Sequence, residues 1–135
     1  RLPHRSRVLV VDDNTVAREI IVGFLDHSRF SVRTAAGGAE GLTIAATFMP
    51  SLLVVDVMMP RMDGVEFCRR IRAMEGLKDA PVLFMTALDD DAVRHRALSI
   101  GNCNWIEKPF TRTDLRARVD NLTRHGSAEA TTPST

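Results

Sequence analysis

The sequence has no long apolar run and no leader-like start, and both absences exclude classes of protein. Its longest uninterrupted apolar runs are only about four residues long, far short of the roughly 18 that a membrane-spanning helix needs. No positively charged segment followed by an apolar stretch opens the chain, as a secretory signal would. We therefore expect a cytoplasmic protein that does not insert into membranes.

The chain also has few cysteines and almost no net charge. Cys68 and Cys103 are the only cysteines, so the chain has neither a C-x-x-C motif nor a disulfide scaffold, and both are expected to be buried thiols. The formal net charge is only +1, so no overall field attracts nucleic acid, and we expect none to bind this domain. Any function based on charge must come from a local group of residues.

The remaining composition is that of an ordinary globular domain. The chain has 135 residues, of which 44% are hydrophobic and 26% are charged, enough for one core and too few for two. Residues 124–135 are small and polar without apolar periodicity, which predicts a flexible tail or linker. The sequence begins with Arg1, and we leave open whether it stands alone or is part of a longer polypeptide.

Short apolar runs recur along the chain and predict five strands. They span residues 8–11, 31–35, 52–55, 82–85 and 105–106, of which the second and the last are weaker. The strong runs lack polar alternation, as is typical of strands buried on both faces of a parallel sheet. Helix-length segments separate them, and strict alternation of this kind predicts an α/β fold, a doubly wound sheet with helices on both faces.

Capping residues and apolar spacing predict the helices. A shorter helix is expected after residues 37–38, and another from residues 89–91 to Gly101. Three further helices each show a cap followed by apolar residues that share one helical face: Val16, Ile20 and Phe24 after Asn14; Val65, Cys68 and Ile71 after Asp63; and Leu115, Val119 and Leu122 after the Thr111–Asp114 capping box.

Polar residues follow the strongest predicted strands at their carboxyl ends. Asp12 and Asp13 follow the first run, Asp56 ends the third, and Thr86 ends the fourth. Ligands of open α/β sheets bind at this edge. Three carboxylates there would repel one another unless a cation held them ionised. Because the set is all oxygen, it favours Mg²⁺, or Mn²⁺, over zinc.

A single cation completes the predicted site. Lys108 is one of two lysines in the chain and comes just after the last predicted strand. Its ammonium group suits an oxyanion or a phosphate. Pro109 follows it and makes this peptide bond a candidate for the cis form. Acids, a hydroxyl and an ammonium group in this arrangement are typical of phosphoryl transfer, which needs positioning and charge neutralisation.

Four fragments together resemble the receiver domain of bacterial two-component response regulators, over residues 6–123. They are the acidic pair Asp12–Asp13, the loop 56–64 with its Met-Asp-Gly sequence, the pair Thr86–Ala87, and the Lys-Pro-Phe turn at 108–110. Each fragment is weak alone, but all four occur in order at the ends of predicted strands. The resemblance implies a five-stranded, flavodoxin-like sheet in the order 2-1-3-4-5.

The resemblance also implies a role for each site residue. Asp56 would be the phosphoacceptor, and Thr86, Ala87 and Lys108 would bind the phosphoryl group. The metal would be held by the carboxylates of Asp12, Asp13 and Asp56 and by the backbone carbonyl of Met58, with Asp12 acting directly or through water. Thr86 and Trp105 would form the conformational switch. The implied partners are a histidine kinase or phosphotransfer protein and a downstream effector or fused output domain.

Three functions compete on this site. The first is a phosphoacceptor switch that is not an enzyme with a small substrate. The second is a magnesium-dependent phosphatase with an aspartate nucleophile, which would need a second acid two residues later, where this chain has Met58. The third is an interaction domain whose phosphorylation site is inactive. The presence of all the expected acids, the Thr86 hydroxyl and Lys108 disfavours this third function. Because Met58 and Leu88 offer no polar group to orient water, we expect slow hydrolysis of a phosphorylated Asp56.

Overall fold

The structure is a computed structural model that describes residues 5–87 and 91–128, with side chains described up to residue 124. Strands and helices alternate along the chain, as the sequence predicts. The strands are β1 (Ser6–Val11), β2 (Phe30–Ala35), β3 (Leu52–Asp56), β4 (Val82–Thr86) and β5 (Cys103–Glu107). The helices are α1 (Thr15–Phe24), α2 (Gly38–Phe48), α3 (Gly64–Arg72), α4 (Asp91–Ala97) and α5 (Arg112–Ala128).

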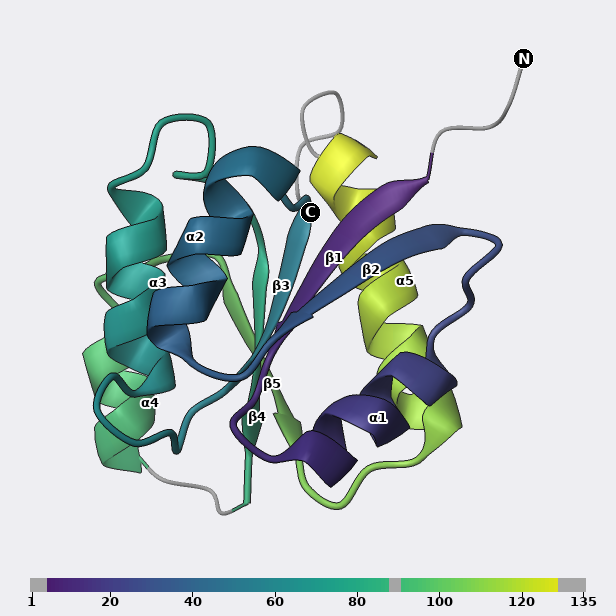
Figure 1. Cartoon of the computed structure of the whole chain (residues 1–135), viewed down its shortest axis with the longest axis horizontal. Helices are drawn as coiled ribbons and strands as arrows, with labels where there is room; N and C mark the ends of the chain where they lie inside the picture. Colours follow the sequence, from purple (N-terminus) through teal and green to yellow (C-terminus); the bar gives the residue numbers. More distant parts are fainter. Residues whose placement is uncertain (1–4, 88–90, 129–135) are drawn as a thin grey trace.

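Within the described residues the five strands form one parallel sheet. Their order is β2-β1-β3-β4-β5, which confirms the predicted doubly wound topology. Helices α1 and α5 cover one face, and α2, α3 and α4 cover the other (Figure 1). Because all strands run in the same direction, their carboxyl ends meet at one edge, the lower edge of the sheet in Figure 1.

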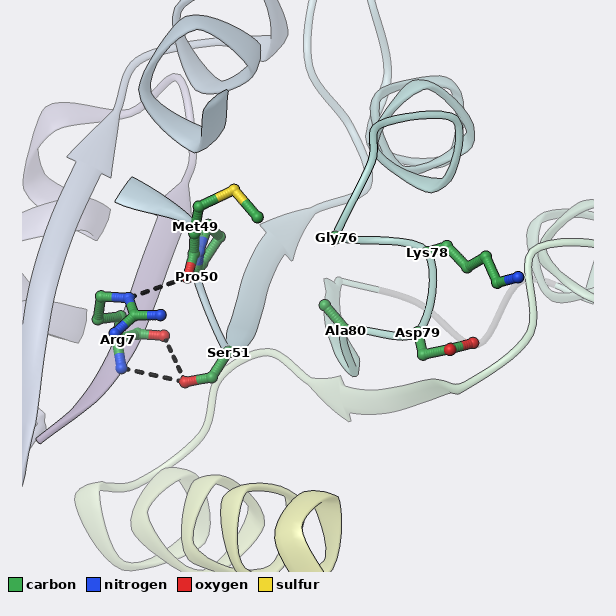
Figure 2. A pocket seen from close by; sticks show the side chains of 8 residues that line it. All are labelled: Arg7, Met49, Pro50, Ser51, Gly76, Lys78, Asp79 and Ala80. Carbon is green, nitrogen blue, oxygen red and sulfur yellow. Dashed lines mark hydrogen bonds between the residues drawn. The ribbon is translucent and has the colours of Figure 1, made fainter. Parts of the chain in front are cut away.

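A hollow of about 470 Å³ lies at the opposite edge, near the amino ends of β1 and β3. Figure 2 shows Arg7 across this hollow from Lys78 and Asp79. The Nε of Arg7 donates to the carbonyl of Met49 at 2.9 Å, and its backbone N–H donates to the hydroxyl of Ser51 at 3.0 Å. These bonds fix the start of β1 against the connection between α2 and β3, far from the predicted site.

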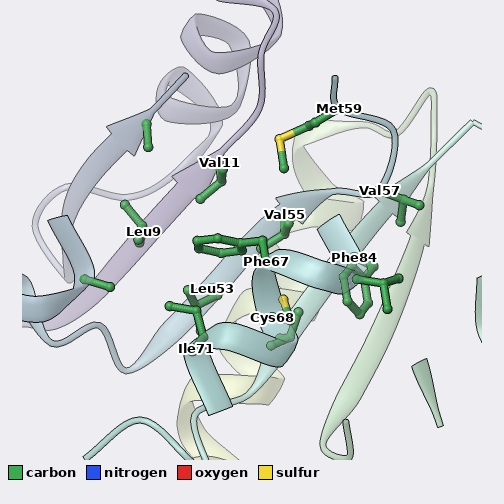
Figure 3. Close-up of a cluster of buried hydrophobic side chains, with 14 of the residues drawn as sticks. Leu9, Val11, Leu53, Val55, Val57, Met59, Phe67, Cys68, Ile71 and Phe84 are labelled. Atoms are coloured by element: carbon green, nitrogen blue, oxygen red, sulfur yellow. The ribbon is translucent and has the colours of Figure 1, made fainter. Parts of the chain in front are cut away.

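The sheet divides the core into two clusters, because successive side chains of each strand point to opposite faces. Leu9, Val55 and Phe84 pack under α2 and α3, together with the fully buried Phe67 of α3 (Figure 3). The alternate residues of the same strands pack under α1 and α5: Val8, Val10, Leu52, Val54, Leu83 and Met85. Both faces of the sheet are buried at these strands, which explains why the strands have apolar residues at successive positions.

Helix α1 differs from its predicted orientation. Val16 and Ile20 share a face with Phe24, but their side chains remain 62% and 49% exposed. Ile21 and Leu25 pack into the core instead. The apolar surface of α1 is wider than the strip that the sheet covers, so periodicity alone cannot select the buried edge. In α3 and α5 the predicted residues Cys68, Ile71, Leu115 and Val119 are all buried, as expected.

Two helix ends also differ from the sequence-based expectation. Helix α4 ends at Ala97 rather than near Gly101, because residues 98–100 form turns before the left-handed Gly101 and Asn102. Helix α5 continues to Ala128, past the start of the predicted tail at residue 124. Adding residues to an existing helix costs little free energy, because the nucleus has already formed. Leu88, the predicted helix start at 89–90 and residues 129–135 lie outside the described residues.

Two further expectations concern the cysteines and membranes. Cys68 is fully buried, whereas Cys103 is only partly buried, and neither forms a disulfide. Burial raises the pKa of both thiols, with the larger effect on Cys68, so neither is a reactive thiolate at neutral pH. In the described ranges, no helix combines the length and the apolar character that crossing a membrane requires.

Candidate functional site

Three polar side chains lie at the carboxyl ends of β1, β3 and β4. Asp12 follows β1, and its N–H extends the sheet by donating to the carbonyl of Ala35 at 3.1 Å. Asp56 and Thr86 are the last residues of β3 and β4. Asp12 is fully buried, and only 8% of Asp56 and 7% of Thr86 are exposed. Since Asp56 pairs with Met85, Thr86 lies one residue beyond it on the neighbouring strand.

The three predicted acids converge. Carboxylate oxygens of Asp12, Asp13 and Asp56 all lie within 4.8 Å of one another. The Oδ1 of Asp12 accepts a hydrogen bond from the N–H of Asn14 at 2.9 Å, whereas its buried Oδ2 has no hydrogen-bond donor among the described residues. The Lys108 ammonium group lies 3.5 Å from this Oδ2 without a hydrogen bond to it, so the burial of the oxygen is compensated only in part. The donor set therefore fits a hard divalent metal ion such as Mg²⁺.

Lys108 joins this acidic cluster from the end of β5. Its Nζ lies 3.5 Å from the Oδ2 of Asp12 and 3.5 Å from the Oδ1 of Asp56. These separations indicate ionic contacts rather than short hydrogen bonds. The backbone N–H of Lys108 donates to the carbonyl of Thr86 at 2.7 Å, and the Lys108–Pro109 peptide bond is cis. One ammonium group cannot offset three carboxylates, so the cluster keeps a negative charge that attracts a second cation.

The ionisation of Asp56 is set by its surroundings. Burial raises the pKa of this carboxyl above its ordinary value, Lys108 acts in the opposite direction, and the nearby Asp12 raises it further. The raised pKa means that the charged form, which a nucleophile needs, is disfavoured inside the fold. A bound metal ion would reverse this penalty by adding positive charge next to the carboxylate.

The chain after Asp56 is held close to it. The N–H of Met58 points to the Oδ1 of Asp56 at 3.3 Å, while the Met58 side chain is 71% exposed. Asp63 caps the start of α3, and a Cβ added to the following Gly64 would lie only 2.4 Å from the Asp56 carbonyl oxygen. Only glycine allows this approach of α3 to the end of β3.

Trp105, the predicted switch residue, lies apart from the acids. It pairs with Phe84 across β4 and β5, and the two rings stack with their centroids 4.9 Å apart. The guanidinium of Arg94 in α4 lies 4.9 Å from the Trp105 ring centroid, a cation–π contact. Trp105 therefore contacts both α4 and β4. Strand β4 ends at Thr86, two residues after Phe84.

An apolar groove of about 490 Å³ lies beside the acidic cluster. It runs between α1 and the turn after β5, and Lys108 belongs to both the groove and the cluster. Its lining combines one face of α1 with residues that follow β4 and β5: Ala17, Ile20, Ile21, Phe24, Ala87, Lys108, Pro109 and Phe110. Ala87, a predicted phosphate contact, is thus part of the groove lining.

Sequence reasoning missed two arginines near the site. Arg18 donates from Nη1 to the backbone carbonyl of Asp12 at 2.6 Å. Arg96 of α4 pairs with Asp63 at 3.0 Å, which ties α4 to the loop that follows Asp56. The position of Arg18, four residues after the helix cap Asn14, was a usable signal, because helical side chains point back toward the amino end. The Asp63–Arg96 pair has no local sequence signal.

Comparison with known proteins finds one family. The sequence model of the response regulator receiver domain matches residues 8–120. A curated relative, the response regulator MprA of Mycobacterium avium, is 40% identical over 123 residues, which are 91% of this chain and 53% of that protein. This chain spans about half the length of the curated relatives it matches.

Solved structures agree with this similarity. The chemotaxis protein CheY4 of Vibrio cholerae is 28% identical with a TM-score of 0.84, over 88% of this chain and 99% of that chain. A putative response regulator from Chloroflexus aurantiacus is 30% identical with a TM-score of 0.81, over 90% of this chain and 99% of that chain. The matched residues 8–120 contain every side chain of the site described above.

Proposed function

This chain belongs to the response regulator receiver domain family, and on that premise we propose that Asp56 accepts a phosphoryl group from a phosphohistidine of a histidine kinase or phosphotransfer protein. The observation that carries the proposal is the convergence of Asp12, Asp13 and Asp56 with the Lys108 ammonium group 3.5 Å from the acceptor. In the transfer, an Asp56 oxygen forms a bond to phosphorus. The phosphorus–nitrogen bond breaks, and the imidazole leaves with its electron pair.

The residues around Asp56 divide the work of this transfer. Lys108 faces the position of the incoming phosphoryl oxygens and offsets their charge. The carboxylates of Asp12, Asp13 and Asp56, with the Met58 carbonyl, would hold Mg²⁺ or Mn²⁺. When bound, this ion would neutralise the acids and polarise the phosphoryl oxygens. The need for such an ion is supported by the buried Asp12 Oδ2, which accepts no hydrogen bond from the described residues and has only an ionic contact with Lys108 at 3.5 Å.

Phosphorylation would then change the surface of the domain. The hydroxyl of Thr86 and the backbone at Ala87 would bind the new phosphoryl oxygens and draw their loop toward Asp56. Trp105 of β5 would respond, because its ring stacks on Phe84, which lies in β4 two residues before Thr86. A downstream effector or a fused output domain would read the altered surface through a change in affinity.

The test is phosphorylation by a small acyl phosphate. We expect the purified chain to gain the mass of one phosphoryl group in the presence of Mg²⁺ and none in the presence of a chelator. The single tryptophan should change its emission on adding Mg²⁺ and again on adding beryllofluoride. A chain that stays unmodified with Mg²⁺ and both acyl phosphate and a phosphorylated kinase would contradict the proposal.

A phosphate-release assay with a phosphate monoester tests the alternative function. A phosphatase would release many equivalents of phosphate from a phosphate monoester, whereas a switch domain would accept one group and hold it. The chain favours the second behaviour, because the side chain two residues after Asp56 is the exposed thioether of Met58, which cannot transfer a proton. We therefore expect a long-lived phosphorylated state.

The kinase or phosphotransfer partner needs a docking surface next to Asp56, and we assign the groove between α1 and the β5–α5 turn to it. This groove is apolar, and it is continuous with the acidic cluster through Lys108. Ile20, which is 49% exposed, lines the groove, and the exposed Val16 lies one helical turn before it on α1. A helix with an apolar face beside its phosphohistidine would match this surface and bring phosphorus to Asp56.

Ile20→Glu is expected to slow phosphoryl transfer from the partner protein at least about tenfold, because a charge would enter the apolar contact. Phosphorylation by the small acyl phosphate should stay unchanged, since the side chain is 49% exposed and outside the acidic cluster. The matched control is Leu98→Glu, a similar change at a 73% exposed position after α4. Equal transfer rates for both variants, measured by rapid quench, would remove α1 from the docking surface.

A further inference from the structure

Arg18 reaches from α1 back over the acidic turn. Its Nη1 donates to the backbone carbonyl of Asp12 at 2.6 Å, and its Nη2 donates to the hydroxyl of Thr15 at 3.2 Å. The side chain is partly buried, and its direction is the usual one for a long helical side chain. Arg18 thus touches the backbone of the acidic pair rather than its carboxylates.

The bonded carbonyl belongs to the peptide unit that joins Asp12 to Asp13. The Asp12 side of this unit is already fixed by the strand hydrogen bond to Ala35 and by the bond from Asn14. Within the described residues nothing donates a hydrogen bond to the exposed Asp13 carboxylate. Because a peptide unit is planar, holding its carbonyl also fixes the position of the Asp13 Cα. The Asp13 side chain then starts from a fixed point beside the cluster.

We propose that Arg18 is a positioning residue of the metal site: it holds the Asp12–Asp13 peptide so that the Asp13 carboxylate stays within reach of a divalent cation. This inference rests on the proposed function of the acidic cluster. It concerns a backbone contact, so Arg18 acts on the metal only through Asp13.

The proposal makes a prediction opposite in sign to simple electrostatics. A guanidinium group near the cluster repels a divalent cation, so removing its charge alone would tighten Mg²⁺ binding. Removing the carbonyl bond would instead loosen the Asp12–Asp13 turn and weaken binding. Partners that orient metal ligands typically contribute roughly 10-fold or more to affinity, which exceeds the expected gain from one partly screened charge.

The test measures the Mg²⁺ dissociation constant by calorimetry, with Mn²⁺ relaxation as a second readout. Arg18→Met, which keeps an unbranched side chain as far as the position of Nε but removes the donor and the charge, should bind Mg²⁺ about tenfold more weakly. Arg18→Lys, which can still donate to the Asp12 carbonyl, should stay within about threefold of the wild type. The control Arg5→Met removes the same charge at the other end of β1 and should change nothing.

The outcomes separate this inference from the proposed function. A wild-type chain that does not bind Mg²⁺ overturns both. If the wild type binds and Arg18→Met binds equally or more tightly, only the role of Arg18 is overturned. Circular dichroism monitors folding, and Arg18→Gln, whose amide ends two bonds short of the Nη atoms, carries the same test if the methionine variant does not fold.

Discussion

Asp56→Asn is expected to take up no phosphoryl group from either an acyl phosphate or a phosphorylated kinase. The amide that replaces the carboxylate has no anionic oxygen to attack phosphorus, and the neighbouring Asp12, whose Oδ2 also lies 3.5 Å from the Lys108 Nζ, is fully buried. Intact-mass measurement after incubation with Mg²⁺ checks this. The matched variant Asp13→Asn also removes one acid but leaves the acceptor, so it should still be labelled when Mg²⁺ is in excess.

The same substitution should stabilise the metal-free protein. Burial raises the pKa of Asp56 in the folded state, so its ionised form opposes folding at neutral pH. This penalty is absent below the unfolded-state pKa of about 3.9 and grows as the pH rises through the raised folded value. With a chelator at neutral pH, Asp56→Asn should raise the free energy of unfolding by roughly 1 kcal/mol. The variant should therefore unfold at a higher temperature than the wild type. The difference should shrink toward acidic pH.

Magnesium provides the internal control for that result. The ion should raise the unfolding temperature of the wild type more than that of Asp56→Asn, because only the wild type presents all three carboxylates to it. A variant that loses stability in the chelator would contradict the unfavourable burial of the ionised Asp56, and a labelled Asp56→Asn chain would contradict its assignment as the acceptor.

Phe67→Ala is expected to produce the largest loss of stability, about 4 kcal/mol, out of a total of roughly 5–15 kcal/mol for a domain. The Phe67 ring is fully buried in the cluster under α2 and α3. The ring packs against Gly41 of α2 so closely that a Cβ added to this glycine would lie only 2.8 Å from the Cε1 of Phe67. Urea denaturation measures the loss, and Leu98→Ala at an exposed site should change stability by less than about 0.5 kcal/mol.

Gly41→Ala tests whether the ring and the glycine form one packed unit. In the wild type the added methyl group meets Phe67 and should destabilise the fold. In the Phe67→Ala background the methyl group would fill vacated space, and alanine gains about 1 kcal/mol of helix propensity over glycine. The two changes should therefore be strongly non-additive. Additive losses would show that α2 and α3 relax independently.

Much of the fold followed from patterns that sequence displays directly. Strands buried on both faces have apolar residues at every position, so the runs at β1, β3 and β4 were predicted close to their observed bounds. Asn14 and Asp63 cap α1 and α3 as expected. The orientation of α1 was not predictable, because its apolar surface exceeds the area that the sheet covers and leaves Val16 and Ile20 exposed.

The candidate site was predictable for a topological reason. Carboxyl ends of parallel strands meet at one edge, so polar residues that end separate runs had to converge there. Arg18 and the Asp63–Arg96 pair were missed, because their contacts depend on side-chain directions and on the placement of α4 rather than on strand order. The strand order itself came from the family resemblance, since alternation alone permits other windings.

The direction of the helices gives the acidic edge a property that no single side chain supplies. Helices α1 and α3 begin directly after the loops that contain Asp13 and Asp63. Each peptide carries a dipole along the helix axis, so these helices direct their partially positive amino ends toward the carboxyl edge of the sheet. The winding of the chain thus builds a field that favours anions beside the cluster, and part of that attraction should persist in a variant without the Lys108 ammonium group.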